Sequence, residues 1–514
     1  MALARVYCHF FAPARVGPNR HWSVEAIGLA RSVLLYGLQR KFEVTDWGER
    51  QLVHNRNMSK WLCCALLTGT LGMVTVRAEE PEGIVGKSEW LFNKYEVLKS
   101  TDAAQTAQSI ELIGRFNRVL KANGVSLAMT MVPLKMRIYS EYLPDSIKLT
   151  DYMAGNYEQV NKALQAAGVT LIDLNTPFMS SPKRNSDTFL FYRLDSHWNL
   201  TGAMLGAETI KAGIVANKAL KGALDATPEV AYKMTVGKRK LPSKGRNLLA
   251  VLPRNSGPFA PEQFTPVSVV RVQASSEEKS PLIGVTVAGS SASQEWTGFL
   301  DALRYVLQRD ILNVSVHGLI GPWVGMESYL RSDAFQANPP KLLIWEWAES
   351  TVRAPPDYQY QDARYVSNNT EWLLRASAWV QAACKPSTVT AKIARTGLAA
   401  NALNLKGADV VTGPTGESEF VEITFDKPLE KLDYLAARAI TAGSKTLTLE
   451  GTGTGTATRR FTLDVPGDDA AHILKTPLSS NGGGFSKVRV YPGKSSAFTL
   501  RDIQICRQPE DLLK

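Results

Sequence analysis

An aspartate and a histidine two residues apart, Asp195 and His197, are the side chains of this sequence best suited to acid–base chemistry. They lie in the short, mostly polar segment 191–199, which we expect to be a loop. A carboxylate that holds an imidazole is a common means of activating a weak nucleophile. The alternative is a solvated aspartate beside a histidine that packs against Trp198, and the segment alone does not decide between the two.

The other histidines lack this pairing. The sequence contains six histidines: His9, His21, His54, His197, His317 and His472. Three lie beyond residue 78, and of these only His197 follows a carboxylate by two residues in a polar segment. His197 is therefore the candidate general base.

A candidate nucleophile follows the apolar segment 281–288, which is typical of a buried strand. A glycine, Ser290 and Ser291 come directly after it, and a helix is expected from about Gln294. The Ser291 hydroxyl would then lie near helix N-terminal N–H groups that can stabilise an oxyanion. The serines could instead only cap that helix, and Ser290 or Ser293 could take the place of Ser291.

Nucleophile, base and orienting carboxylate are the three roles of acyl transfer through a covalent intermediate, and Ser291, His197 and Asp195 can fill them. The elements around them alternate between strand and helix. Strands are expected at 125–133, 169–174, 281–288, 311–316 and 341–347, and helices at 101–123, 156–167, 200–220 and 326–335. This alternation predicts an α/β domain with a mainly parallel sheet flanked by helices, and in such sheets sites lie at the carboxyl ends of the strands.

The helix expected at 200–220 begins directly after the Asp195/His197 segment. Its candidate buried positions are Ala203, Ala207, Ile210 and Ile214.

The pattern changes towards the C-terminus. A last helix is expected at 370–383, and the domain boundary between residues 365 and 385. Short β-rich runs then alternate with turns, which predicts an antiparallel β-sandwich. The runs are 420–425, 446–449, 461–465, 487–491 and 498–505, with loops expected at 451–456 and 479–484.

Length and composition describe a globular chain. Its 514 residues suit two or three domains, with 44% hydrophobic residues, 21% charged residues and a net charge of +11. Without the first 78 residues, which hold ten Lys/Arg and four Asp/Glu, the net charge is +5. That surplus suits mild attraction to a polyanion and does not indicate binding to nucleic acid.

Residues 58–78 have the anatomy of a secretory signal peptide: a basic start at Met58, an apolar core too short to span a bilayer, and a small-residue cleavage site after Ala78. A buried N-terminal helix is the alternative. Because a signal peptide begins a protein, we expect residues 1–57 to be a non-native extension.

Two cysteines remain after this expected signal peptide, Cys384 and Cys506. An even number in an oxidising compartment suggests one disulfide, and two unlinked thiols are the alternative. Closing so long a loop would contribute about 4 kcal/mol in the chain-entropy model.

Four segments carry a family resemblance: 86–92 (GKSEWLF), 194–199 (LDSHWN) with Gly202 and Ala203, the Gly-Ser-Ser at 289–291, and 343–346 (LIWE). Together they resemble the SGNH-hydrolase-like domain of bacterial polysaccharide O-acetyltransferases, the alginate enzymes of the AlgX and AlgJ type in particular. The β-rich C-terminal part resembles the carbohydrate-binding module of the AlgX type. The resemblance implies a catalytic domain at 79–370, a β-sandwich carbohydrate-binding module at 384–507, and a periplasmic location.

The sequence departs from the wider SGNH superfamily in two ways. Asp195 and His197 precede Ser291, whereas the serine comes first in most of the superfamily. The strand end that elsewhere supplies an asparagine to the oxyanion hole reads Trp-Glu-Trp at 345–347. Another group must then serve, and Gly321 and Tyr329 are candidates.

The resemblance further implies ping-pong acetyl transfer through an acetyl-serine, with no metal or other cofactor. The acetyl group would come from a membrane-embedded partner and go to the hydroxyls of an anionic exopolysaccharide, alginate, with other export proteins as partners. Basic side chains that could face its carboxylates, or lie in solvated loops, are Lys183, Arg184, Lys238, Arg239 and Lys240.

Two other functions fit the same residues. One is a polysaccharide acetyl esterase, with water as the acceptor. The other is a non-catalytic polysaccharide-binding scaffold of the biosynthetic complex.

Overall fold

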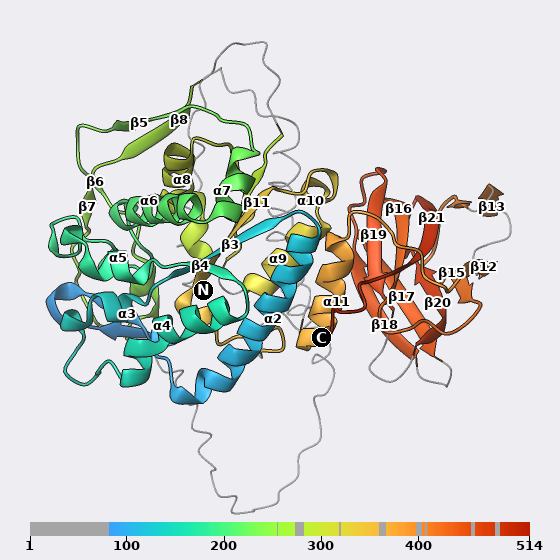
Figure 1. The fold of residues 1–514 in the computed structure, drawn as a ribbon, viewed down its shortest axis with the longest axis horizontal. Helices are drawn as coiled ribbons and strands as arrows, with labels where there is room; N and C mark the ends of the chain where they lie inside the picture. Colours follow the sequence, from blue (N-terminus) through green and yellow to red (C-terminus); the bar gives the residue numbers. More distant parts are fainter. Residues whose placement is uncertain are drawn as a thin grey trace, which may run out of the picture. The chain divides into compact units, whose positions relative to one another are not determined.

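A parallel sheet of five strands occupies the centre of the N-terminal part, in the order β10-β9-β11-β3-β4 (Figure 1). Its strands are β3 (Ser126–Val132), β4 (Thr170–Ile172), β9 (Val285–Ala288), β10 (Ile311–Asn313) and β11 (Leu342–Ala348). All neighbouring pairs are parallel. The expected α/β class is confirmed, because apolar runs such as β3 and β11 are covered on both faces.

The computed structural model describes residues 82–253, 255–272, 282–317, 320–358, 366–396, 403–406, 409–453, 458–478 and 484–514. The expected extension at 1–57 and signal peptide at 58–78 lie outside the described residues. Among the described helices, none combines the length and the apolar character that a membrane span requires.

Alternate side chains of the sheet enter two different cores. Met129 and Met131 of β3 pack with one set of helices, whereas Ala128 and Val132 pack with the other. The first set consists of α2 (Ala103–Ala122), α4 (Asp151–Ala166), α9 (Pro322–Arg331), α10 (Asp333–Ala337) and α11 (Asn369–Val380). The second consists of α5 (Asn175–Ser180), α6 (Leu200–Ala216), α7 (Lys218–Asp225) and α8 (Phe299–Leu307).

The helix expected at 200–220 is two helices, α6 and α7. Asn217 separates them because its side-chain oxygen accepts the N–H groups of Ala219 and Leu220 and so caps a new helix. The four expected apolar positions are all fully buried: Ala203, Ala207, Ile210 and Ile214.

The helix expected from Gln294 is wrong by five residues, since α8 begins at Phe299. Two short 3₁₀ turns precede it, Ser291–Ser293 and Glu295–Thr297, and Gly298 ends the second with a φ of 79°. Ser291 therefore lies in a tight turn and not at the start of an α-helix.

Short two-stranded antiparallel sheets also belong to this domain. They are β1 (Gly83–Val85) with β2 (Leu91–Asn93), β5 (Tyr232–Val236) with β8 (Val267–Arg271), and β6 (Leu241–Pro242) with β7 (Gln263–Phe264).

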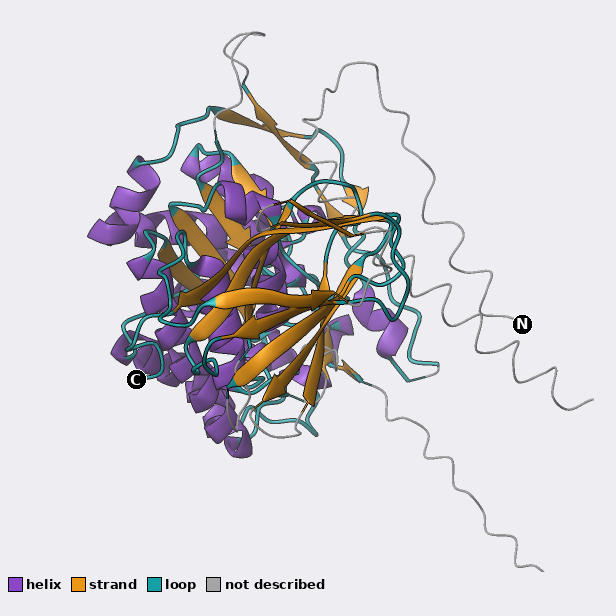
Figure 2. Cartoon of the chain, turned by 90° about the vertical axis from the view of Figure 1, so that its right-hand side faces the viewer, coloured by secondary structure: helices purple, strands orange, loops and turns teal. Residues whose placement is uncertain are grey.

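Two antiparallel sheets form the C-terminal β-sandwich, as expected (Figure 2). One contains β12 (Ala391–Thr396), β15 (Val421–Phe425), β20 (Phe485–Tyr491), β17 (Thr446–Gly453) and β18 (Thr458–Asp464). The other contains β13 (Leu403–Lys406), β14 (Asp409–Thr412), β21 (Ala497–Arg507), β16 (Asp433–Ala442) and β19 (His472–Pro477). The five expected runs fall in β15, β17, β18, β20 and β21, whereas the loop expected from residue 451 is wrong in part, because β17 continues to Gly453.

A disulfide joins Cys384 to Cys506 on β21, as expected. Cys506 is fully buried. The bond closes a loop with a sequence separation of 122 residues that contains most of the sandwich.

Replacing both cysteines, as Cys384→Ser with Cys506→Ser, should lower the free energy of unfolding by about 2–4 kcal/mol, because the unfolded chain regains the entropy of an open loop. Urea denaturation of the wild-type and variant proteins measures this. An unchanged denaturation midpoint would show that the bond does not stabilise the fold.

Candidate active site

The three residues expected to act together converge on one point. The Nε2 atom of His197 lies 2.7 Å from the Ser291 hydroxyl, and its Nδ1 atom lies 2.6 Å from Asp195 Oδ1. With Nδ1–H donating to the carboxylate, Nε2 carries the lone pair that accepts the serine proton. The arrangement can activate Ser291 as a nucleophile, which is the chemistry that the residue types suggest.

Hydrogen bonds fix the Asp195 carboxylate on both of its oxygens. The His197 N–H donates to Oδ1 at 3.0 Å, and the Asn247 N–H donates to Oδ2 at 2.7 Å. Burial opposes ionisation of this group, but the hydrogen bonds and the imidazole outweigh it and hold the pKa of Asp195 below its usual range. The carboxylate therefore remains charged and can stabilise an imidazolium.

The Asp195/His197 segment is a loop closed by its own backbone. The Asn199 N–H donates to Leu190 O, and the Tyr192 N–H donates to His197 O. The Asn199 side chain caps α6 by accepting from Thr201 N and Gly202 N. The loop is thus anchored to the start of a buried helix.

Trp198 ties this loop to the serine turn. Its buried indole N–H donates to Ala292 O at 3.0 Å, and its ring packs against Phe299. The indole therefore contacts the residue that follows Ser291. This differs from the alternative in which His197 packs against Trp198.

Glu346 of β11 is fully buried and anchors the serine turn through hydrogen bonds. Its Oε2 atom accepts the Ser290 N–H at 2.8 Å, and both the Ser290 and Ser293 hydroxyls donate to the carboxylate. Burial raises the pKa of Glu346. A Cβ on Gly289 would lie 2.4 Å from the Ser293 hydroxyl and 2.8 Å from Glu346 Oε2, so only glycine fits there.

These contacts separate the three serines. Ser290 and Ser293 are engaged by Glu346, whereas the Ser291 hydroxyl lies against His197. Of the serines considered from sequence, Ser291 alone has the partner that a nucleophile needs.

The groups considered for the oxyanion hole are the Ser291 N–H and the two candidates from sequence, Tyr329 and Gly321. Within the part of the chain that the structure describes, the Ser291 N–H has no hydrogen-bond acceptor, so it is available to an oxyanion. The Tyr329 hydroxyl is buried and pairs with the Thr286 hydroxyl of β9 at 2.9 Å. Gly321 precedes α9 with a φ of 83°.

A buried lysine supports the base loop from the other side. The Lys135 ammonium donates to Leu91 O, Arg193 O and Asp195 O at 2.7, 3.0 and 2.8 Å. Burial lowers the pKa of Lys135 to about 8. Sequence patterns gave no sign of this contact, because the lysine sits in a short helix, α3 (Lys135–Ile138), directly after β3.

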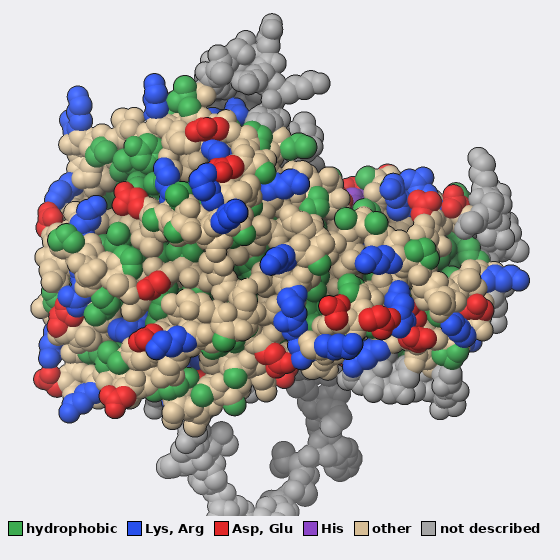
Figure 3. All heavy atoms as spheres, in the orientation of Figure 1, with side chains coloured by type: hydrophobic (Ala, Val, Ile, Leu, Met, Phe, Trp, Pro, Cys, Tyr) green, Lys and Arg blue, Asp and Glu red, His purple; other side chains and the backbone are tan. Residues whose placement is uncertain are grey.

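The basic candidates for polymer binding differ in their exposure and in their contacts within the protein. The Arg184 guanidinium donates to Ile138 O and Glu141 and stacks over Tyr139. Lys183 is exposed, as are Lys238, Arg239 and Lys240 between β5 and β6. Figure 3 shows basic and acidic side chains interspersed over the face it draws.

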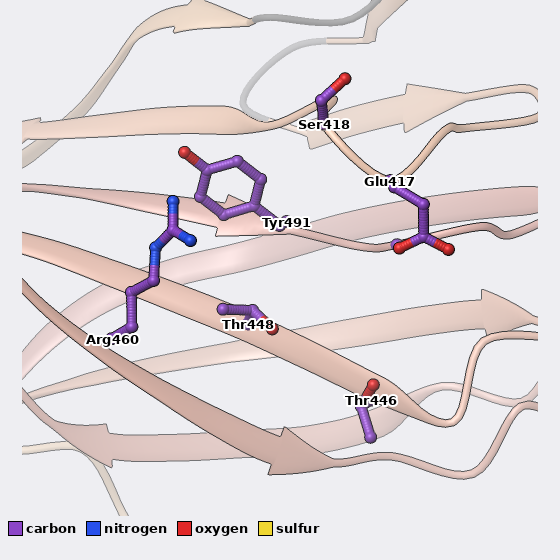
Figure 4. Close-up of a pocket in the computed structure, with 7 residues that line it drawn as sticks. Glu417, Ser418, Thr446, Thr448, Arg460 and Tyr491 are labelled. Atoms are coloured by element: carbon purple, nitrogen blue, oxygen red, sulfur yellow. The ribbon is translucent and has the colours of Figure 1, made fainter. Parts of the chain in front are cut away.

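The β-sandwich carries a pocket of about 420 Å³ on the outer face of one sheet (Figure 4). Arg460 lies over the ring of Tyr491, with their centres 5.6 Å apart. The lining residues are Glu417, Ser418, Thr446, Thr448, Arg460, Tyr491 and Gly493. An aromatic ring, hydroxyls and a cation together suit a polar, partly apolar ligand such as a sugar.

Among the described residues, no three His, Cys, Asp or Glu side chains are grouped so that they could hold a metal ion.

Comparison with known proteins identifies relatives. The family model for the SGNH hydrolase-like domain of acetyltransferase AlgX matches residues 84–349. A probable alginate O-acetylase AlgJ of Pseudomonas syringae pv. tomato is 27% identical over 56% of this chain and 73% of its own length. The alginate biosynthesis protein AlgX of Azotobacter vinelandii is 24% identical over 72% of this chain and 74% of its own length.

A solved structure shares the fold over both parts of the chain. The structure of Pseudomonas aeruginosa AlgX matches 83% of this chain and 95% of its own length, with a TM-score of 0.56 and 18% identity.

Replacing Glu346 with alanine should lower kcat for hydrolysis of a chromogenic acetyl ester by roughly 10–100-fold with little change in KM, because the serine turn loses its three anchors. Glu346→Gln should be milder, since its amide oxygen can still accept from the Ser290 N–H. Steady-state kinetics of the two variants decide this. Equal activity in wild type and Glu346→Ala would remove Glu346 from any positioning role.

Proposed function

Because the match over residues 84–349 places the chain in the AlgX family of SGNH-hydrolase-like acetyltransferases, we propose that it transfers acetyl groups to the hydroxyls of alginate through an acetyl-Ser291 intermediate. The observation that carries the proposal is the pair of short hydrogen bonds on His197, one to Asp195 and one to Ser291. Each partner is fixed independently, so the imidazole is held in the orientation that general-base catalysis needs.

In the first half-reaction, His197 Nε2 takes the Ser291 proton as Oγ attacks the carbonyl carbon of the acetyl donor. The Ser291 N–H supports the oxyanion. His197 then returns the proton to the leaving group, and the acetyl ester of Ser291 remains. Asp195 stays charged throughout and stabilises the imidazolium between these steps.

The second half-reaction repeats the cycle with a sugar hydroxyl. His197 removes the hydroxyl proton as the sugar oxygen attacks the acetyl carbon, the bond to Ser291 Oγ breaks, and the proton passes to Ser291. The product is an acetylated sugar, and the free serine is restored. No step of this mechanism requires a metal ion.

The proposed setting is the periplasm, with the acetyl group supplied by a membrane-embedded partner and other export proteins acting on the same polymer. The disulfide between Cys384 and Cys506 supports an oxidising compartment. The relatives named as alginate proteins support the choice of polymer. The exposed Lys183, Lys238 and Arg239 are available to uronate carboxylates, and Lys240 is exposed too, with its ammonium 3.8 Å from the Asp187 carboxylate.

The pocket on the sandwich supports a polymer acceptor. We assign Tyr491 to contact with the apolar face of a sugar ring and Arg460 to its carboxylate. The Arg460 Nε–H donates to the Glu450 carboxylate, but the side chain is 67% exposed, so its remaining N–H groups are accessible to a ligand carboxylate.

Ser291→Ala should lower hydrolysis of a chromogenic acetyl ester by at least about 10³-fold, because the nucleophile is lost. Ser180→Ala, in α5, is the matched control and should retain the wild-type rate. A second measurement follows labelled acetate onto oligomannuronate or into water by mass spectrometry. Wild-type activity in Ser291→Ala would assign another nucleophile. Release into water alone, at saturating oligomannuronate, would make the protein an esterase.

Arg460→Ala and Tyr491→Ala should each weaken oligomannuronate binding about ten-fold, since each removes one side of the pocket. Titration calorimetry measures the affinity, and Ser291→Ala prevents turnover. Arg438→Ala is the matched control, because Arg438 is an exposed arginine on the opposite sheet, in β16. Equal affinities for all three variants would place polymer binding elsewhere.

A further inference from the structure

In the described part of the α/β domain, one tryptophan is exposed and the others are buried. Trp296 is 44% exposed, and every other tryptophan in the described part of the chain is 5% exposed or less. Leaving an indole in water forgoes the favourable burial of a large apolar surface. An exposed aromatic side chain beside a reactive group therefore calls for an explanation in terms of what it contacts.

The indole of Trp296 lies directly beside the candidate base. Its ring centre is 5.1 Å from that of the His197 imidazole, and the two rings meet edge to face at 82°. The indole N–H donates to Gln294 Oε1 at 2.9 Å, so its one polar group is already satisfied by the protein. What remains for a ligand is an apolar aromatic surface that adjoins the proton-accepting imidazole.

The backbone that carries Trp296 is fixed to the same turn as the nucleophile. The buried Thr297 hydroxyl contacts Ala292 O and Gln294 O, both at 2.8 Å. Arg304 of α8 binds the Glu295 carboxylate through two contacts of 3.1 Å. These contacts fix the segment that carries the indole. Binding of a ligand against the indole therefore requires little further ordering of the protein.

We propose that Trp296 is the stacking platform of the acceptor subsite: the C–H face of a pyranose ring lies on the indole and brings one of its hydroxyls to His197 Nε2. This rests on the proposed acetyl transfer and names the residue that selects a sugar over water as acceptor. Sugar rings carry apolar C–H faces, and aromatic side chains bind them through contact area with few lost degrees of freedom.

Stacking also explains how transfer wins over hydrolysis. After acetyl-Ser291 forms, the stacked sugar hydroxyl gives its proton to His197 Nε2 as its oxygen attacks the acetyl carbon. The bond from that carbon to Ser291 Oγ breaks, and Ser291 takes the proton back. Because the ring covers the imidazole from the Trp296 side, water reaches the acetyl-enzyme less often while a sugar is bound.

The first test measures acceptor kinetics with a chromogenic acetyl ester as donor and oligomannuronate as acceptor. Trp296→Ala should lower kcat/KM for the acceptor about ten-fold or more and shift the products from acetylated sugar to free acetate. Trp296→Phe should keep most of the transfer, since an aromatic face remains. Val215→Ala, an exposed apolar position on α6, is the control and should match wild type. An unchanged ratio of transfer to hydrolysis in Trp296→Ala would overturn the proposal.

The second test needs no donor and no turnover. In Ser291→Ala protein, oligomannuronate should reduce acrylamide quenching of tryptophan fluorescence, and the effect should vanish when Trp296→Phe is added. The difference between these proteins isolates the signal of one indole. If the oligosaccharide protects no indole at that position, the platform is wrong even where Ser291 is acetylated. If the oligosaccharide protects the indole but the protein with Ser291 intact forms no acetyl-enzyme, the proposed reaction fails and the subsite stands.

Discussion

The His197 imidazole bridges two segments that are 94 residues apart in the chain, and the site exists only while both of its hydrogen bonds hold. The bond to Asp195 sets the tautomer and the ring orientation, and the bond to Ser291 uses that orientation. A shift of about 1 Å in either segment would open the serine contact and lose the activation that it provides. The surrounding contacts are best understood as means of keeping the two segments in register.

Three buried polar side chains maintain that register from different directions. Trp198 joins the base loop to the serine turn through Ala292 O, Glu346 anchors the turn through Ser290 and Ser293, and Lys135 anchors the loop through Asp195 O. Each is at most 1% exposed and hydrogen-bonded, so the desolvation of its polar group is offset by partners within the protein. Because the sheet is parallel, the serine turn after β9 and the end of β11 meet at the same edge.

Sequence patterns were sufficient for the fold class and for bringing Asp195, His197 and Ser291 together, because these depend on strand–helix alternation and on residue types that carry chemistry. They were insufficient where a residue's partner is distant in the chain. Glu346 sits in an apolar run, and a charge in such a run was the available signal, but nothing local identifies Ser290 and Ser293 as its partners. The strand β16 was missed because its alanines have low β propensity, although pairing with β19 and β21 stabilises it.

The account depends most directly on the identity of the acylated atom. The decisive measurement is peptide mass spectrometry of the protein after brief reaction with an activated acetyl donor and an acid quench. We expect one acetyl group, on the peptide that contains Ser291 and on that residue, with none in the His197→Ala protein. Acetylation of another residue, or equal acetylation of Ser291 without His197, would contradict the account.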